Sequence, residues 1–318
     1  MESIVDRIRK LRDRRRAVIL AHNYTLHEVQ DLADFVGDSL ELAFRAAEAR
    51  ADVIVLCGVY FMAETAKLLN PGASVLMPDL RAGCPMADML TVEDLRQAKA
   101  AHPGCAVVCY VNSSAAVKAE SDICCTSSNA AAIIAGIPAT QPILFVPDRN
   151  LGEWAGEVVG RDVKCWDGYC PTHERILPQY VQQAREQHPG ALVVVHPECT
   201  SPVRAMANHV ASTSGILSFC RTSSCSAFIV ATERGLLHRL RAENPTKEFF
   251  EASPHMICPN MKLTTAEKIL WCLEDLPGEV TVADDVAPGA RRAIDRMLAV
   301  APPRCRKARG RGVDHEPH

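Results

Sequence analysis

The chain has 318 residues, of which 48% are hydrophobic and 23% are charged, and its formal net charge is -3. This is the composition of a soluble globular protein, and the length suffices for one large core or for two to three smaller ones. The small net charge favours neither nucleic acid nor an acidic membrane as a partner, so small-molecule chemistry is the expected class of function.

The first residues, MESIVDRIRKLRDRRR, carry charge but no apolar core of signal-peptide length. Apolar residues between Ile4 and Leu11 recur at helical spacing, which predicts an amphipathic helix with a solvated, arginine-rich face. No later stretch reaches the roughly 18 to 20 apolar residues of a membrane span. We therefore expect a cytoplasmic protein with no membrane or nucleic-acid partner, whose fourteen cysteines do not form a disulfide framework.

Short apolar runs rich in Val and Ile alternate along the chain with alanine-rich helical stretches. The pattern begins with AVILA, VQDLADFVGDSLELAFRAAEA, DVIVLCGV and MAETAKLL. Such alternation is typical of βαβ units, whose parallel strands are continuously apolar because helices cover both faces of the sheet. The sequence therefore predicts an α/β fold with parallel sheets.

The alternation also repeats as a block of about 86 residues. Three apolar runs, AVILAHNY, AVVCYVNS and ALVVVHPE, each end in polar residues, and His22, Tyr110 and His196 within them are 88 and 86 residues apart. Such a period indicates repeated structural units. We predict three α/β domains, each a three-layer unit with a parallel sheet, related by a pseudo-threefold axis around a central active site. A solenoid is less favoured, because a different polar residue at each equivalent position suits a closed arrangement.

The spacing also predicts where the units begin and end. The predicted boundaries are 1–86 for the first α/β repeat, 87–172 for the second and 173–260 for the third. Residues 261–300 are expected to form C-terminal helices that pack back on the body. The basic, Pro- and Gly-rich stretch 301–318 is expected to be a disordered tail.

Polar residues stand at equivalent places in the three predicted units. Residues i and i+2 of an extended segment point to the same side, so a pair at a strand end projects toward one cavity. Hydroxyls near helix starts, with backbone N–H groups, can hold a carboxylate or phosphate. Singly, such residues are most often plain caps or structural residues, but their threefold recurrence favours a pocket for a small polyanion. They are His22 with Tyr24, Tyr110 with Asn112, His196 with Glu198, and the hydroxyl residues Ser39, Ser127 and Thr213.

Three cysteines, Cys84, Cys170 and Cys258, are followed by proline and lie 86 and 88 residues apart. Thiolates from three repeats could hold three irons of a 4Fe-4S cluster and leave the fourth iron open as a Lewis acid. They could instead hold zinc, with water or His173 as the fourth ligand, or be buried thiols in equivalent core positions. The cluster is the leading interpretation because the polar residues keep the same spacing. The remaining cysteines are expected to be structural.

Many uncommon segments between about residue 17 and residue 270 resemble quinolinate synthases. Among them are AHNY, GDSLELA, AGCPMADM, CYVNSSAAVKAESDICCTSSNA, FVPDRNLG, GYCPTHERI, HPECTSPV, STSGI, ATERGL and CPNMK. The resemblance implies an enzyme of NAD biosynthesis that condenses iminoaspartate with dihydroxyacetone phosphate to quinolinate, releasing phosphate and two waters. It also implies an oxygen-sensitive 4Fe-4S cluster, and aspartate oxidase is a candidate supplier of iminoaspartate.

The resemblance assigns roles to the repeated residues. It implies that Cys84, Cys170 and Cys258 bind the cluster and that the nine polar residues above line the pocket. Three local departures from the family pattern touch none of these positions. They are the residues after AHNY, Asn208 in place of the more usual aspartate, and the segment SFCRTSSCSAF, which is richer in cysteine than expected. The expected rivals are a cluster-based redox sensor and a zinc-dependent hydrolase or aldolase. The catalytic candidates are Glu198, His22, Tyr24, His196 and Tyr110.

Overall fold

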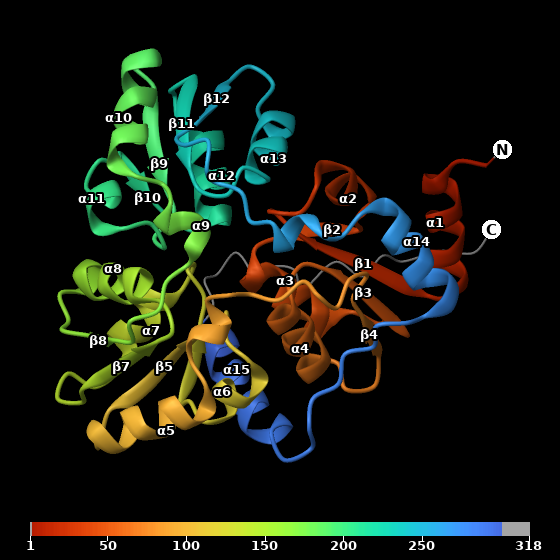
Figure 1. The fold of residues 1–318 in the computed structure, drawn as a ribbon, viewed down its shortest axis with the longest axis horizontal. Coiled ribbons are helices and arrows are strands. Elements are labelled where there is room, and N and C mark those ends of the chain that lie inside the picture. Colours follow the sequence, from red (N-terminus) through yellow and green to blue (C-terminus); the bar gives the residue numbers. More distant parts are fainter. Residues whose placement is uncertain (1, 301–318) are drawn as a thin grey trace.

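The computed structural model describes residues 2–300, and the tail expected at 301–318 lies outside the described residues. Figure 1 shows three α/β lobes arranged around a common centre. Each lobe holds a parallel four-stranded sheet with helices packed against it. The predicted α/β fold of three similar units is confirmed. Among residues 2–300, no helix is both long enough and apolar enough to cross a membrane.

The three sheets share one strand order, in which the first strand of each unit lies between the second and the third, and the fourth forms an edge. All strand pairs in these sheets are parallel, so their carboxyl ends lie at one edge. The strands of the first unit are β1 (Ala17–His22), β2 (Phe35–Gly37), β3 (Val53–Cys57) and β4 (Ser74–Leu76). Those of the second are β5 (Ala106–Tyr110), β6 (Ile123–Cys125), β7 (Ile143–Val146) and β8 (Lys164–Cys165). Those of the third are β9 (Leu192–Val195), β10 (His209–Val210), β11 (Ala227–Ala231) and β12 (Glu248–Glu251).

Helices connect the strands, as parallel sheets require. The first unit contains α1 (Ile4–Arg14), α2 (His27–Leu32), α3 (Ser39–Glu48) and α4 (Tyr60–Leu69). The second contains the 3-10 turn η1 (Ala87–Met89), α5 (Val92–Ala101), α6 (Ala115–Ala119), α7 (Ala130–Gly136) and α8 (Arg149–Val159). Then follow α9 (Pro171–Glu174), α10 (Pro178–Gln187), α11 (Ser201–Arg204), α12 (Thr213–Thr222), α13 (Leu236–Glu243) and the 3-10 turn η2 (Asn260–Lys262). The last helices are α14 (Ala266–Asp275) and α15 (Ala287–Ala299).

One hydrogen bond recurs in all three units and ties each central strand to the loop before its edge neighbour. In each case a strand N–H donates to a side-chain oxygen fifteen residues further along, at 2.8 Å. Asn208 therefore does what aspartate does in the other two units, because an amide oxygen accepts this bond as well as a carboxylate does. The three pairs are Ile19 with Asp34, Val107 with Asp122, and Val193 with Asn208.

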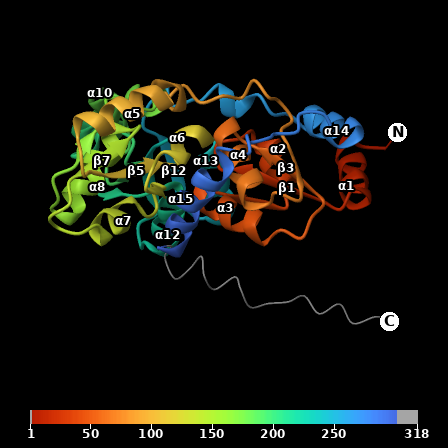
Figure 2. The same cartoon turned by 90° about the horizontal axis from the view of Figure 1, so that it is seen from below.

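The main hydrophobic core is continuous through the three units, and a smaller core lies between the first sheet, α1 and α14. Helix α14 packs against α1, and Figures 1 and 2 show the two side by side at one end of the molecule. Helix α15 lies against α6 and β6 of the second unit. Each sheet lies inside one of the predicted repeats, and the boundaries at 86, 172 and 260 remain proposals.

Asp79 joins the loop after β4 to helix α14. It accepts hydrogen bonds from Arg81 Nη2 at 2.8 Å and from Lys268 Nζ at 2.7 Å. The hydrogen bond from Arg81 contributes most to lowering the pKa of Asp79 below its ordinary value, and the bond from Lys268 adds to it against the opposing effect of burial. The ionised form of Asp79 is thus favoured by folding.

We expect Asp79→Asn to lower the free energy of unfolding at neutral pH by about 1–3 kcal/mol, because charge-assisted hydrogen bonds are lost. A lowered folded-state pKa contributes stability above the unfolded pKa of about 4, and this contribution declines as the pH falls below it. The difference between wild type and variant should therefore be smaller at about pH 3 than at neutral pH. Urea unfolding at both pH values measures it, with the exposed Asp275→Asn on α14 as control; a difference independent of pH would contradict the prediction.

Candidate active site

A cavity of about 210 Å³ lies where the three units meet. Strand ends, helix starts and the Cys-Pro turns of all three units contribute to its wall. All twelve residues singled out from the sequence line it. They are His22, Tyr24, Ser39, Tyr110, Asn112, Ser127, His196, Glu198, Thr213, Cys84, Cys170 and Cys258.

The two strand-end histidines are held in the same way. His22 Nδ1 accepts the backbone N–H of Tyr24 at 3.2 Å, and His196 Nδ1 accepts that of Glu198 at 3.3 Å. Burial lowers the pKa of His22 to about 4 and that of His196 to about 3, although the neighbouring carboxylates act to raise both. Both rings are therefore neutral near pH 7, with the proton on Nε2.

The three hydroxyl residues lie near helix starts, with one difference among them. Ser39 is the first residue of α3 and Thr213 is the first residue of α12, each a helix of ten residues. Ser127 instead lies in the turn before α7, whose N-cap is Asn129. Two of the three hydroxyls thus stand at the positive end of a helix dipole, where side-chain caps already bond some of the first N–H groups.

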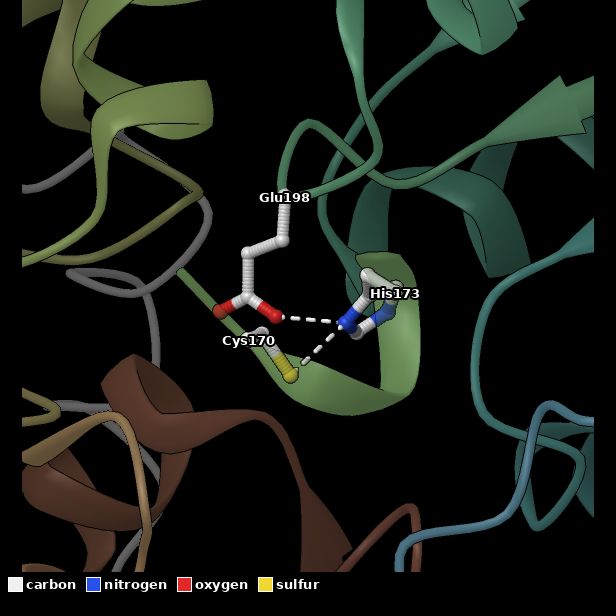
Figure 3. A group of neighbouring side chains, drawn as sticks. All are labelled: Cys170, His173 and Glu198. Carbon is white, nitrogen blue, oxygen red and sulfur yellow. Dashed lines mark hydrogen bonds and ion pairs between the residues drawn. The ribbon is translucent and has the colours of Figure 1, made fainter. Parts of the chain in front are cut away.

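The Glu198 carboxylate is buried and receives hydrogen bonds from two sides. Tyr110 Oη donates to Oε1 at 2.6 Å, and His173 Nδ1 lies 2.7 Å from Oε2, as Figure 3 shows for His173. Burial acts to raise the pKa of Glu198, but attraction to His173 and His196 and the hydrogen bonds from His173 and Tyr110 lower it to about 2. Glu198 is therefore a carboxylate near pH 7.

A chain of hydrogen bonds leads from Glu198 to Tyr24 in the first unit. His173 Nε2 lies 2.9 Å from Thr232 Oγ1, which lies 2.6 Å from Tyr24 Oη. A carboxylate can only accept, so His173 Nδ1 carries a proton that it donates to Glu198. These groups can pass a proton along the chain in either direction.

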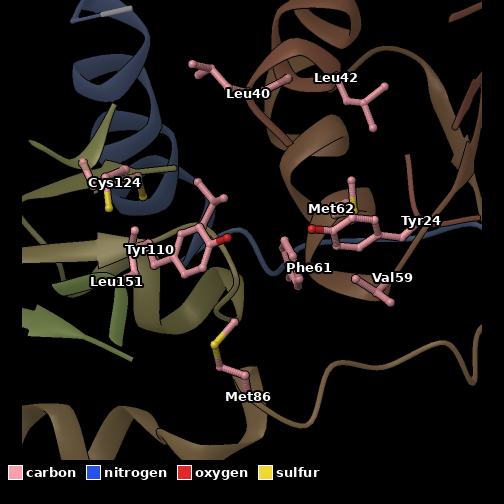
Figure 4. Close-up of a cluster of buried hydrophobic side chains, with 14 of the residues drawn as sticks. Tyr24, Leu40, Leu42, Val59, Phe61, Met62, Met86, Tyr110, Cys124 and Leu151 are labelled. Carbon is pink, nitrogen blue, oxygen red and sulfur yellow. The ribbon is translucent and has the colours of Figure 1, made fainter. Parts of the chain in front are cut away.

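The two tyrosines face the same cavity from different units. Figure 4 shows their hydroxyl groups directed toward each other across the centre. Burial, with the nearby Glu198 carboxylate, raises the pKa of Tyr24 and of Tyr110 well above the ordinary value. Both phenols thus stay protonated at neutral pH and act as hydrogen-bond donors.

The Cys-Pro steps begin three similar turns. Burial raises the pKa of the Cys84 thiol to about 12, while backbone N–H groups of Ala87 and Met86 donate to the sulfur and act to lower it. Burial likewise raises the pKa of the Cys170 and Cys258 thiols, and backbone N–H groups act to lower it. The donor to Cys170 is the N–H of His173, and the donors to Cys258 are those of Met261 and Asn260. Proline fixes φ near the helical value and has no N–H, so it favours a turn whose following N–H groups point back at the sulfur.

This donor set fits an iron-sulfur cluster. Three thiols from three units line one cavity, and N–H donors of this kind stabilise thiolates that bind iron. A mononuclear metal has a different candidate set in Cys170, His173 and Glu198, whose ligand atoms lie within 4.8 Å of one another (Figure 3). His173 Nδ1 lies 3.2 Å from Cys170 Sγ. His173 Nδ1 is also hydrogen-bonded to Glu198, so this nitrogen already has a partner and is not free to bind a metal.

Sequence reasoning missed three residues that organise the site. Thr232 links Tyr24 to His173, and Glu233 accepts the backbone N–H of Cys258 at 3.1 Å while pairing with Lys262 at 2.9 Å. Thr232 and Glu233 lie in the ATERGL segment that follows β11, which carries no threefold-repeated polar residue. The sequence indicated a role for these two residues only by placing them at the end of a predicted strand.

The chain matches a family model described as "Quinolinate synthetase A protein" over residues 6–299. It is 52% identical over 299 residues to a protein of Geobacter metallireducens named quinolinate synthase, which covers 94% of this chain and 98% of that protein. Proteins of the same name from Geotalea uraniireducens and Methanoregula boonei are 50% and 51% identical. These two matches cover 94% and 93% of this chain, and 98% and 97% of the relatives.

We expect Thr232→Val to lower the free energy of unfolding by about 1–3 kcal/mol, because Tyr24 Oη and His173 Nε2 would both lose their buried partner. Valine nearly matches threonine in volume, so the loss reports the hydroxyl and not a cavity. Urea unfolding compares the variant with wild type and with Thr232→Ser, which keeps the hydroxyl and should recover most of the loss. Equal stability of Thr232→Val and wild type would refute the chain of bonds.

Proposed function

Since the chain belongs to the quinolinate synthetase A family, we propose that its cavity condenses iminoaspartate with dihydroxyacetone phosphate. The products are quinolinate, phosphate and two waters, which account for all atoms of the two substrates. Quinolinate synthesis serves NAD biosynthesis. The observation that carries the proposal is the cavity itself, which brings nine polar residues and three cysteines of three units together.

The anionic groups of the substrates are assigned to the helix starts. Ser39 and Thr213 each offer a hydroxyl beside the N–H groups of a ten-residue helix, and Ser127 adds a third hydroxyl. Such groups bind carboxylates and phosphates without placing a cation beside them. We assign His22, Tyr110, Asn112 and His196 to contacts with the rest of the substrate.

Glu198 is the proposed general base. Its carboxylate is ionised and lines the cavity, and hydrogen bonds from Tyr110 and His173 hold it in place. Tyr24 and Tyr110, which stay protonated, can return protons, as can neutral His22 and His196. Enolisation, imine formation and ring closure all need proton transfers of this kind.

Cys84, Cys170 and Cys258 are the residues that would hold a 4Fe-4S cluster. Three thiolates would leave one iron of such a cluster without a protein ligand, and the bound cluster would supply Lewis-acid chemistry for the loss of a hydroxyl as water. The N–H groups that point at each sulfur favour the thiolate form that the cluster requires. The alternative of one zinc held by Cys170, His173 and Glu198 rests on the distances among those three side chains.

The proposal includes the source of the first substrate. Iminoaspartate is unstable in water, so an aspartate oxidase acting nearby in the cytoplasm is the proposed supplier. A mixed assay with and without the oxidase, together with a pull-down, tests for direct contact. Unchanged flux with no association would exclude docking and leave free diffusion as the route.

Protein purified without oxygen should contain about four irons and four sulfides per chain and should be brown. Cys84→Ala should lose the iron and the formation of quinolinate. Cys105→Ala, a partly buried cysteine outside the cavity wall, serves as the matched control and should keep both. One zinc per chain, or quinolinate formed by iron-free protein, would contradict the cluster.

Glu198→Gln should lower kcat by about a hundredfold or more, because the general base is removed, while the iron content stays unchanged. Glutamine has nearly the same shape and keeps an acceptor oxygen for Tyr110. The control is Glu186→Gln on the exposed face of α10. Quinolinate formation within a few-fold of wild type would exclude Glu198 as the base, and loss of iron together with activity would assign it a structural role.

A further inference from the structure

Directly beside the three cavity hydroxyls lie three residues that are hydrogen-bonded to one another. Asp38 precedes Ser39, Ser128 follows Ser127, and Ser212 precedes Thr213. Ser128 Oγ donates to Asp38 Oδ2 at 2.7 Å and forms a second hydrogen bond with Ser212 Oγ at 2.8 Å. We call Asp38, Ser128 and Ser212 the linking trio. Each of the three units contributes one member.

Two members of the trio also cap the helices that begin at the cavity. Asp38 Oδ1 accepts the N–H groups of Leu40 at 3.0 Å and Glu41 at 2.9 Å at the start of α3. Ser212 Oγ accepts the N–H of Gly215 at 3.3 Å at the start of α12. The Asp38 carboxylate therefore holds its own helix with one oxygen and the second unit with the other.

The trio forms part of the wall between two cavities. Ser39, Ser127 and Thr213 line the candidate active site, whereas all three trio members line a second cavity of about 510 Å³. Asp38 lines both cavities, and both Asp38 and Ser212 are only 5% exposed. A change in the trio thus acts on the cavity hydroxyls across a single peptide unit.

Ser128 is the member on which the second unit depends. The first and third units have two further links here, from Asn23 Nδ2 to Thr213 Oγ1 at 3.1 Å and from Ser214 Oγ to Glu41 Oε2 at 2.6 Å. In the second unit the neighbouring Thr126 and Asn129 bond to each other instead, with Thr126 N to Asn129 Oδ1 at 2.7 Å. In this group of side chains, the position of Ser127 relative to the other two hydroxyls therefore depends on Ser128.

We propose that Asp38, Ser128 and Ser212 are positioning residues that hold Ser39, Ser127 and Thr213 at the spacing needed to bind the anionic groups of the substrates. The inference rests on the proposed function, in which those three hydroxyls bind carboxylate or phosphate. Small displacements of binding groups weaken binding strongly, because hydrogen bonds depend on distance and angle. The trio therefore acts on substrate affinity, and Glu198, which performs the proton transfer, is left unchanged.

Ser128→Ala in the enzyme with its cluster tests the proposal. The KM for dihydroxyacetone phosphate should rise about tenfold, while kcat should change by less than about threefold, because binding groups are displaced and the base is not. Calorimetry with dihydroxyacetone phosphate alone should show a similar rise in Kd and needs no turnover. Ser128→Thr keeps the hydroxyl and should restore both values.

The matched control is Ser121→Ala. Ser121 is a buried serine of the same unit whose hydroxyl donates one hydrogen bond, to Val117 O at 2.8 Å, and it does not line the cavity. It should lose a similar amount of stability and leave Kd unchanged. Thermal unfolding of both variants shows whether the loss of stability is matched.

The outcomes separate this proposal from the proposed function. Weaker binding in Ser127→Ala with unchanged binding in Ser128→Ala would overturn the role of the trio and leave the hydroxyl site intact. Unchanged binding in both would overturn the assignment of the hydroxyls to substrate, and the trio with it. A rise in Kd for Ser128→Ala that Ser128→Thr does not reverse, or an equal rise in Ser121→Ala, would also overturn the positioning role.

Discussion

The burial of the Glu198 carboxylate is the constraint on which the centre of the molecule depends. A buried charge without partners costs several kcal/mol, so its neighbours must supply donors. Tyr110 supplies one from the second unit, and His173 supplies another. His173 is held in turn by Thr232, which also binds Tyr24 of the first unit. Separating the units would remove the Tyr110 donor and the bond between Thr232 and Tyr24, so contacts that stabilise the assembly also hold the carboxylate proposed as the base.

Around this carboxylate, two histidines and two tyrosines of the cavity carry no charge near pH 7. Burial keeps His22 and His196 neutral, and Tyr24 and Tyr110 protonated. In the proposed function, the helix starts at Ser39 and Thr213 supply dipoles for the anionic groups of the substrates, in a cavity that Arg175 also lines. Because neutral dipoles attract more weakly than cations, several must act together. Their relative positions then matter more than the strength of any one of them.

The period of the sequence was enough to predict the fold class and which residues share a cavity, because equivalent positions of a repeat fall at equivalent places around an axis. It could not predict the partners of those residues. His173 was considered only as a zinc ligand, and Thr232 and Ser128 were not singled out, because their bonds have no threefold counterpart. The bonds from Thr232 to Tyr24 and from Ser128 to Asp38 and Ser212 also cross between units. Asn208 departs from the family pattern and still makes the bond that aspartate makes in the other units. The N–H of Val193 needs only an acceptor oxygen, and the amide of Asn208 provides one.

The Cys-Pro steps show how repetition limits chemistry. Each unit supplies one thiol and one short turn whose N–H groups point at the sulfur, so three equivalent units offer three equivalent thiols as the proposed ligands. A cubane cluster has four irons, so the proposed cluster would have one iron available to a molecule from outside the protein. His173 Nδ1 lies 3.2 Å from Cys170 Sγ, but its ring is hydrogen-bonded to Glu198 and Thr232. In the proposed function, the hydrogen-bond chain that holds Glu198 would thus also keep that imidazole from the iron without a protein ligand.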